Sequence, residues 1–90
     1  MVVKLIDFYS STCGPCRMLL KSIDKVVADH PEIVVEKYDE NCSNQLIEKY
    51  NVGGVPTLII EKDGVETFRF ERAVPPQEIE KYIWNLSIGW

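Results

Sequence analysis

The chain has 90 residues, of which 46% are hydrophobic and 27% are charged, and its formal net charge at pH 7 is -4. A chain of this length buries one hydrophobic core, so we expect a single domain over residues 1–90. The acidic balance and the lack of any run of Lys or Arg argue against nucleic-acid and membrane-surface partners, and we expect a monomer.

The first predicted element is a strand over Val2–Tyr9, a nearly continuous run of apolar and β-prone residues. Such a run is typical of a strand covered on both faces, so we expect it at the centre of a sheet. Asp7 interrupts the run, and the segment lacks the long apolar region and the cleavage site of a signal peptide. No other stretch approaches the length of a membrane span.

A helix is predicted next, because apolar residues recur at helical spacing over Cys16–Val27 before Pro31 ends the pattern. The segment Ile33–Asp39 follows as a second strand. A strand, a helix and a strand of these lengths predict a right-handed parallel crossover. The stretch Cys42–Asn51 then predicts a short helix with Ser43 as its N-cap.

The second half of the chain predicts a hairpin and a final helix. The segment Thr57–Phe70 contains two extended runs joined at Asp63 and Gly64, a dipeptide that favours the tight turn of an antiparallel hairpin. Pro75 and Pro76 can open the last helix, whose apolar residues repeat at helical spacing. The order βαβαββα predicts an α/β fold with a four-stranded mixed sheet and helices on both of its faces.

The sequence CGPC places Cys13 and Cys16 between the end of the central strand and the start of a helix. Unpaired backbone N–H groups and the helix dipole favour an anion there, and a Cys13 thiolate is such an anion. Gly14 removes bulk beside this sulfur, and Pro15 stiffens the loop without leaving an N–H unpaired. Cys16 then lies one turn into the helix, close enough to attack a mixed disulfide formed at Cys13.

Two structural alternatives compete with this redox interpretation. The possible soft ligands for a zinc ion are Cys13, Cys16, Cys42 and His30. They lack the second cysteine pair of a typical structural zinc site. A purely structural disulfide would close so short a loop that it removes little entropy from the unfolded chain. The pattern therefore favours electron transfer, with Cys42 as a partly exposed loop thiol. Three cysteines suit a reducing compartment, so we expect a cytoplasmic protein.

The chain resembles the thioredoxin family through DFYSSTCGPC, the segment VGGVPT and the order of its elements, over almost its entire length. The resemblance implies that Asp7 is the buried aspartate of the family, Lys37 the lysine beside it, and Pro56 the proline held cis. Burial would raise the pKa of Asp7 and suit it to take the proton of Cys16, while Lys37 satisfies the carboxylate and moderates that shift. A cis Pro56 would turn the Val55 backbone outward, where an extended substrate segment can pair with it.

Other positions imply how the substrate surface is built. Thr12, Gly14 and Pro15 flank the cysteines, and Arg72 aligns with a glycine that helps to form the flat docking surface of the family. Thioredoxins generally carry Trp immediately before the first cysteine and another aromatic residue three positions earlier. Here these positions hold Thr12 and Tyr9, so we expect the rim of the site to be more polar. The initial β-α unit of full-length thioredoxins has no counterpart here, so the chain is closer in size to a glutaredoxin or to the small archaeal and phage-encoded relatives of the family.

The function that the resemblance implies is that of a thioredoxin-type protein-disulfide reductase. Cys13 would attack a disulfide in a protein substrate, Cys16 would release the reduced product, and a thioredoxin-reductase-type enzyme would restore the dithiol with electrons from NADPH or another donor. No bound cofactor and no metal are implied. A glutathione-dependent glutaredoxin is less favoured, because FERAVPP stands where glutaredoxins carry a Gly-Gly and acidic segment. A binding or assembly module that retains the cysteines without turnover also stays open.

Overall fold

The computed structural model describes residues 2–87, which form seven elements in the predicted order. These elements are β1 (Val3–Tyr9), α1 (Gly14–Asp29), β2 (Val34–Asp39), α2 (Asn44–Lys49), β3 (Thr57–Lys62), β4 (Val65–Phe70) and α3 (Pro76–Ser87). Within this described part, no helix is long and apolar enough to cross a membrane.

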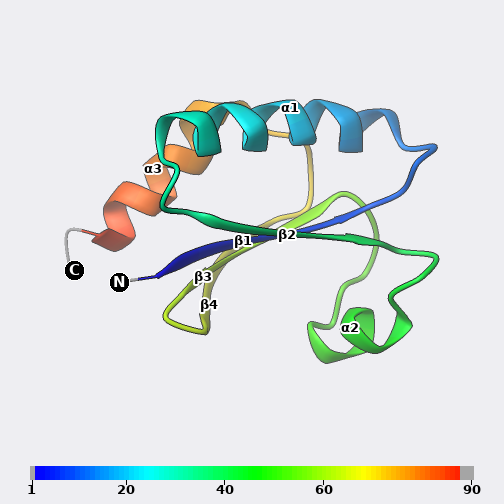
Figure 1. The fold of residues 1–90 in the computed structure, drawn as a ribbon. Helices are drawn as coiled ribbons and strands as arrows, with labels where there is room; N and C mark the ends of the chain where they lie inside the picture. The colour runs from blue at the N-terminus through cyan, green and yellow to red at the C-terminus, as the bar shows by residue number, and fades with distance from the viewer. Residues whose placement is uncertain (1, 88–90) are drawn as a thin grey trace.

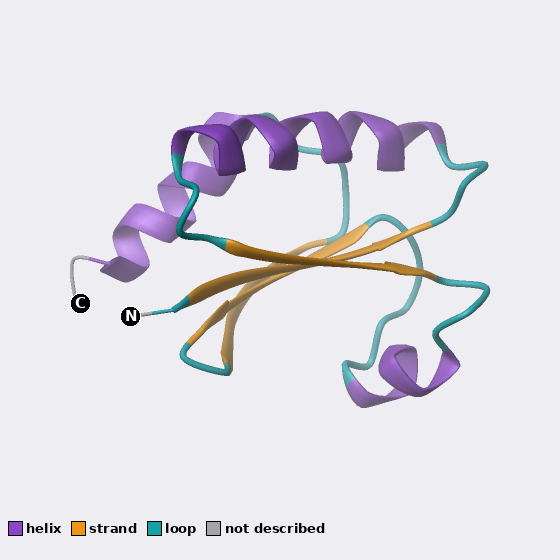
Figure 2. Ribbon diagram, viewed as in Figure 1, coloured by secondary structure: helices purple, strands orange, loops and turns teal. Residues whose placement is uncertain are grey.

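The four strands form one mixed sheet in the order β2-β1-β3-β4. Strand β1 runs parallel to β2 and antiparallel to β3, and β4 runs antiparallel to β3. Because β1 has a neighbour on each side and is buried along most of its length, its prediction as a central strand is confirmed. Figure 1 and Figure 2 show α1 and α3 on one face of the sheet and α2 on the other, as the sequence predicts.

Helix α1 begins two residues before the apolar pattern that predicted it. Cys13 is its N-cap, and Pro15 lies in its first turn, where a missing N–H leaves no hydrogen bond unmade. The helix ends at Asp29, and the backbone N–H of His30 closes it with hydrogen bonds to the carbonyl groups of Val26 and Val27. Pro31 follows at once, so the predicted stop is confirmed to within two residues.

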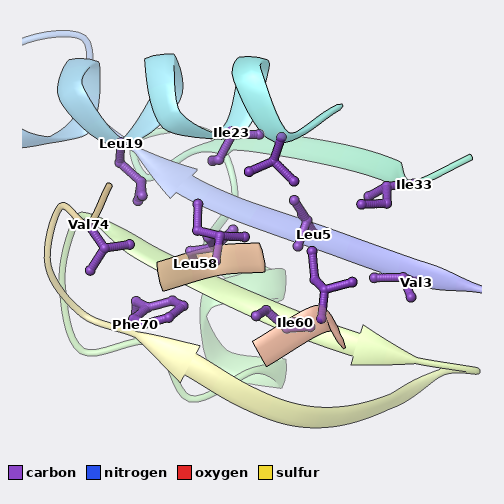
Figure 3. Close-up of a cluster of buried hydrophobic side chains, with 12 residues drawn as sticks. Val3, Leu5, Leu19, Ile23, Ile33, Leu58, Ile60, Phe70 and Val74 are labelled. Atoms are coloured by element: carbon purple, nitrogen blue, oxygen red, sulfur yellow. The ribbon is translucent and has the colours of Figure 1, made fainter. Parts of the chain in front are cut away.

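The hydrophobic core is divided unequally between the two faces of the sheet. The larger cluster lies under α1 and α3 and contains twelve buried residues, among them Leu5, Leu19 and Leu58 (Figure 3). The hydrophobic cluster on the α2 side contains three buried residues, Ile6, Phe8 and Ile59. Since burial of one such side chain contributes about 1.5–3 kcal/mol, the α1 and α3 face provides most of the apolar stabilisation.

Two local predictions have different outcomes. The turn between β3 and β4 is confirmed, because Asp63 and Gly64 both have positive φ angles, 52° and 84°, as the tight primed turn requires. Ser43 stands at the N-cap of α2, but its side chain makes no capping hydrogen bond, so the expected cap is wrong in its chemistry. The partly buried side chains of Leu46 and Ile47 pack against the sheet instead.

Candidate active site

The two cysteines of the CGPC segment form a disulfide at the N-terminus of α1. Their Cα atoms are 5.2 Å apart. The loop that leaves β1 turns tightly here, because the N–H of Cys13 donates to the carbonyl of Ser10 at 3.2 Å. As the N-cap residue, Cys13 also accepts a hydrogen bond on Sγ from the N–H of Cys16 at 3.1 Å. The helix N-terminus therefore presents a backbone donor to this sulfur.

The two sulfurs differ in exposure. Cys16 is 3% exposed, whereas Cys13 is half-buried, and Thr12, Gly14 and Pro15 beside it are all exposed. No acidic residue lies in the first turn of α1 to oppose a negative charge on Cys13. A thiolate at Cys13 would thus be accessible to a partner and favoured by the helix terminus.

A cavity of about 250 Å³ lies beside the buried cysteine. Its lining residues are Asp7, Tyr9, Ser10, Ser11, Cys16, Arg17, Leu20 and Lys37. Of the predicted catalytic residues, the cavity thus brings Asp7, Cys16 and Lys37 together. The other five lining residues were not predicted as cavity residues. Their positions in the sequence could have indicated that they lie near Cys16. The two serines directly follow β1, and Arg17 and Leu20 lie one and four positions beyond Cys16 in α1.

Asp7 is a buried carboxylic acid in the floor of this site. It is 1% exposed, and its Oδ1 atom has no hydrogen-bond partner. Burial raises the pKa of Asp7 from 3.8 to about 6, while the positive charge of Lys37 lowers it and the negative charge of Asp24 raises it. An acid with this pKa exchanges protons readily near neutral pH.

The side chain of Lys37 lies differently from the prediction. Lys37 is the register partner of Asp7 in the parallel pair of β1 and β2, yet its ammonium group pairs with Asp24, with Nζ 3.9 Å from Oδ1. The expected direct pairing with Asp7 is therefore wrong, and Lys37 acts on Asp7 through its positive charge, which lowers the pKa of that carboxyl. A hydrated ammonium on a long stem can reach an exposed carboxylate without the desolvation that a buried one would demand.

The loop before β3 brings a second predicted segment to the same edge of the sheet. The Val55–Pro56 peptide bond is cis, as expected; Pro56 is buried and Val55 half-buried. Because Thr57 at the start of β3 pairs with Phe8 near the end of β1, this loop lies where the chain leaves β1 toward the cysteines. The Thr57 hydroxyl donates to the carbonyl of Gly54 at 2.6 Å and holds the loop together.

Two other predicted residues lie outside the cavity beside Cys16. Arg72 is exposed and lines a shallow hollow between β4 and α3 that also includes Tyr82. Cys42 is a free, exposed thiol in the loop before α2, as the sequence predicted. Among residues 2–87, no three His, Cys, Asp or Glu side chains are grouped closely enough to hold a metal ion.

Comparison with known proteins identifies what this arrangement is similar to. The thioredoxin family model matches residues 2–85. The thioredoxin of Chlamydia trachomatis is 42% identical over 83 residues, which cover 92% of this chain and 78% of that protein. The chloroplastic thioredoxin Y2 of Arabidopsis thaliana is 35% identical over 82 residues, covering 90% of this chain and 49% of that protein.

Solved structures agree with the sequence comparisons. The oxidised form of mitochondrial thioredoxin 3 from Saccharomyces cerevisiae superposes with a TM-score of 0.81 at 30% identity, covering 92% of this chain and 77% of that one. Fasciola hepatica thioredoxin superposes with a TM-score of 0.83 at 28% identity, covering 93% of this chain and 80% of that one.

Proposed function

The chain belongs to the thioredoxin family and is a thioredoxin-type disulfide oxidoreductase, and on this premise we propose that it works as a protein-disulfide reductase. The observation that carries the proposal is the Cys13–Cys16 disulfide at the N-terminus of α1, in which Cys13 is half-buried and Cys16 is buried beside a cavity that Asp7 also lines. This arrangement suits two sequential thiol exchanges.

The proposed cycle transfers two electrons to the substrate. The thiolate of reduced Cys13 attacks one sulfur of a substrate disulfide, forming a mixed disulfide and releasing the first substrate thiolate. The thiolate of Cys16 then attacks the Cys13 sulfur and releases the second substrate thiolate. The substrate is reduced to two thiols, and the enzyme is left with the Cys13–Cys16 disulfide. Cys13 takes the first step because it is the more exposed sulfur and accepts the N–H of Cys16.

Asp7 is the proposed general base of the second step. It lines the same cavity as Cys16, and its pKa of about 6 leaves it able to accept the proton of that thiol near neutral pH, directly or through water. Lys37 and Asp24 act on this proton transfer through their charges. This assignment is supported by the buried Oδ1 atom of Asp7, which has no hydrogen-bond partner and so remains a free acceptor.

The proposed substrates are proteins with exposed disulfides. The surface offered to them comprises Thr12, Gly14 and Pro15 with the loop at Val55 and Pro56, whose backbone can pair with an extended segment. Arg72 lies farther along the same sheet edge, after β4, and would contact only a larger partner. We propose further that a thioredoxin-reductase-type enzyme regenerates the dithiol, that no bound cofactor takes part, and that the protein works in the cytoplasm.

Reduction of insulin disulfides tests this proposal. The assay uses NADPH with each of several thioredoxin reductases, and in parallel NADPH with glutathione and glutathione reductase. We expect turnover with a thioredoxin reductase and none with Cys13→Ser, whereas Cys42→Ser should be as active as the unsubstituted protein because that thiol lies outside the site. Turnover only with glutathione would instead indicate a glutaredoxin. Silence in both systems, with retained partner binding after replacement of Cys13 and Cys16 by Ser, would indicate a binding module.

A further inference from the structure

A third charged residue, Asp24 on α1, takes part in the arrangement around Asp7. Asp7 and Lys37 are partners in the register of β1 and β2, so they would be natural neighbours if the lysine side chain turned inward. Lys37 Nζ instead lies 3.9 Å from Asp24 Oδ1, and Asp7 Oδ1 has no hydrogen-bond partner. The lysine beside the buried acid is therefore engaged by a different carboxylate.

We propose that Asp24 is a positioning residue for the proton transfer: its carboxylate draws the Lys37 ammonium toward solvent and keeps it from pairing with Asp7. The inference rests on the proposed function, in which Asp7 accepts the proton of Cys16. An ion pair between Lys37 and Asp7 would stabilise the Asp7 carboxylate and weaken it as a base. Asp24 thus preserves the basicity that the transfer needs.

The ion pair joins α1 to β2 at the protein surface. Asp24 and Lys37 line one hollow together with Val27 and Val35, so the aliphatic stem of the lysine has an apolar floor while its ammonium stays in water. The two charged side chains are 44% and 64% exposed for Lys37 and Asp24 respectively. At this exposure an ion pair is weak and screened by salt. Asp24 therefore shifts the preferred position of the ammonium and does not lock it.

The charged and titratable groups around Asp7 come from three elements. They are Lys37 from β2, Arg17 and Asp24 from α1, and Tyr9 from the end of β1. Strand β3 places only the apolar Leu58 opposite Asp7. Among the charged groups, Lys37 lowers the pKa of Asp7 and Asp24 raises it, after the larger effect of burial. The direction of the Asp24 effect agrees with its proposed role. An experiment must separate the part of this effect that acts through Lys37 from direct repulsion between the Asp24 and Asp7 carboxylates.

Carbon-13 NMR titration of the Asp7 carboxyl in the oxidised protein makes this separation, since the disulfide removes both site thiols from the titration. Asp24→Asn should lower the pKa of Asp7 from about 6 by roughly half a unit, because Lys37 is released to approach it. In a Lys37→Gln background the same substitution should have a clearly smaller effect, since only direct repulsion remains. Asp24→Glu retains the charge and should keep the pKa near that of the unsubstituted protein.

A matched control is Asp29→Asn, which removes an exposed carboxylate from the last residue of the same helix and should leave the pKa of Asp7 unchanged. Equal shifts from Asp24→Asn with and without Lys37, or no shift where Lys37 is retained, would overturn the proposal. Because the titration requires no turnover, its result is separate from the outcome of the insulin assay.

Discussion

At the scale of single residues, the buried acid Asp7 couples folding to pH. A carboxyl that is 1% exposed and has an unpartnered oxygen holds its proton more tightly in the folded chain than in the unfolded one. Its pKa is about 6 when folded and near its ordinary value of 3.8 when unfolded. Burial disfavours the charged form of Asp7. Its contribution to the free energy of unfolding is therefore fully present below about pH 4 and is lost as the pH rises through about 6.

Asp7→Asn is therefore expected to stabilise the oxidised protein at neutral pH. A difference of about two pKa units corresponds to about 3 kcal/mol, and the buried amide of Asn offsets part of it, so we expect the free energy of unfolding at pH 7.5 to rise by about 1–3 kcal/mol. The gain should shrink toward pH 4. Urea denaturation at both pH values measures it, with Asp29→Asn as the control. A gain of the same size at pH 4 would show that relief of charge burial is not its cause.

The residues of the site were predictable to different degrees. Asp7 is visible in the sequence because a charged residue interrupts an apolar central strand, and the cysteine pair is visible from its position at a strand-to-helix junction. The partner of Lys37 was not predictable. Solvation and packing decide which carboxylate a long flexible side chain contacts, and the spacing of residues in the sequence does not reveal this. The separation of Arg72 from the cavity likewise depends on the path of the chain after β4.

At the scale of secondary-structure elements, the hairpin turn is the clearest link from sequence to structure. Asp63 and Gly64 adopt positive φ angles, which a tight turn between twisted antiparallel strands requires. Glycine tolerates this conformation because it has no Cβ, and aspartate is among the side chains that tolerate it best. The start of α1 was less predictable, since it depends on the Cys13 cap and lies ahead of the apolar stripe.

Gly64→Ala should destabilise the protein by about 1 kcal/mol through backbone strain alone. A Cβ at this position would meet no atom within 4 Å, so no steric clash adds to the effect. Gly53→Ala is the matched control: its surroundings are equally open and its φ angle is not positive, so the loss should be absent or replaced by a small gain. Equal losses in the two variants, measured by chemical denaturation, would contradict the assignment of strain to Gly64.

At the scale of the whole molecule, the sheet is unequally supported on its two faces. Helices α1 and α3 cover the cluster of twelve buried residues, and Ser22 of α1 reinforces that side by donating a 2.6 Å hydrogen bond to the carbonyl of Val74. Helix α2 has six residues, none of them buried, and its N-cap side chain makes no capping hydrogen bond. Such a short helix is marginal by itself and depends on contacts with the sheet.

Helix α2 is therefore expected to open locally while the rest of the domain stays folded. The N–H groups of Ile47 and Tyr50, bonded to the carbonyl groups of Ser43 and Leu46, should exchange with solvent at least about 100-fold faster than those of central strand β1. Native-state hydrogen exchange followed by NMR measures both sets in one sample.

The contacts between α2 and the sheet decide whether the α2 amides exchange slowly or fast. Leu46, Ile47 and Tyr50 contact the smaller cluster around Phe8, which lies on the strand that leads into the cysteine loop. The comparison is made under conditions where the exchange rate reports the opening equilibrium and is not limited by the rate of opening. If the α2 amides then exchange as slowly as those of β1, these three contacts are strong enough to join α2 to the global unfolding unit. If they exchange faster, α2 and the loop that carries Cys42 form a separate, weakly held unit beside a rigid active site.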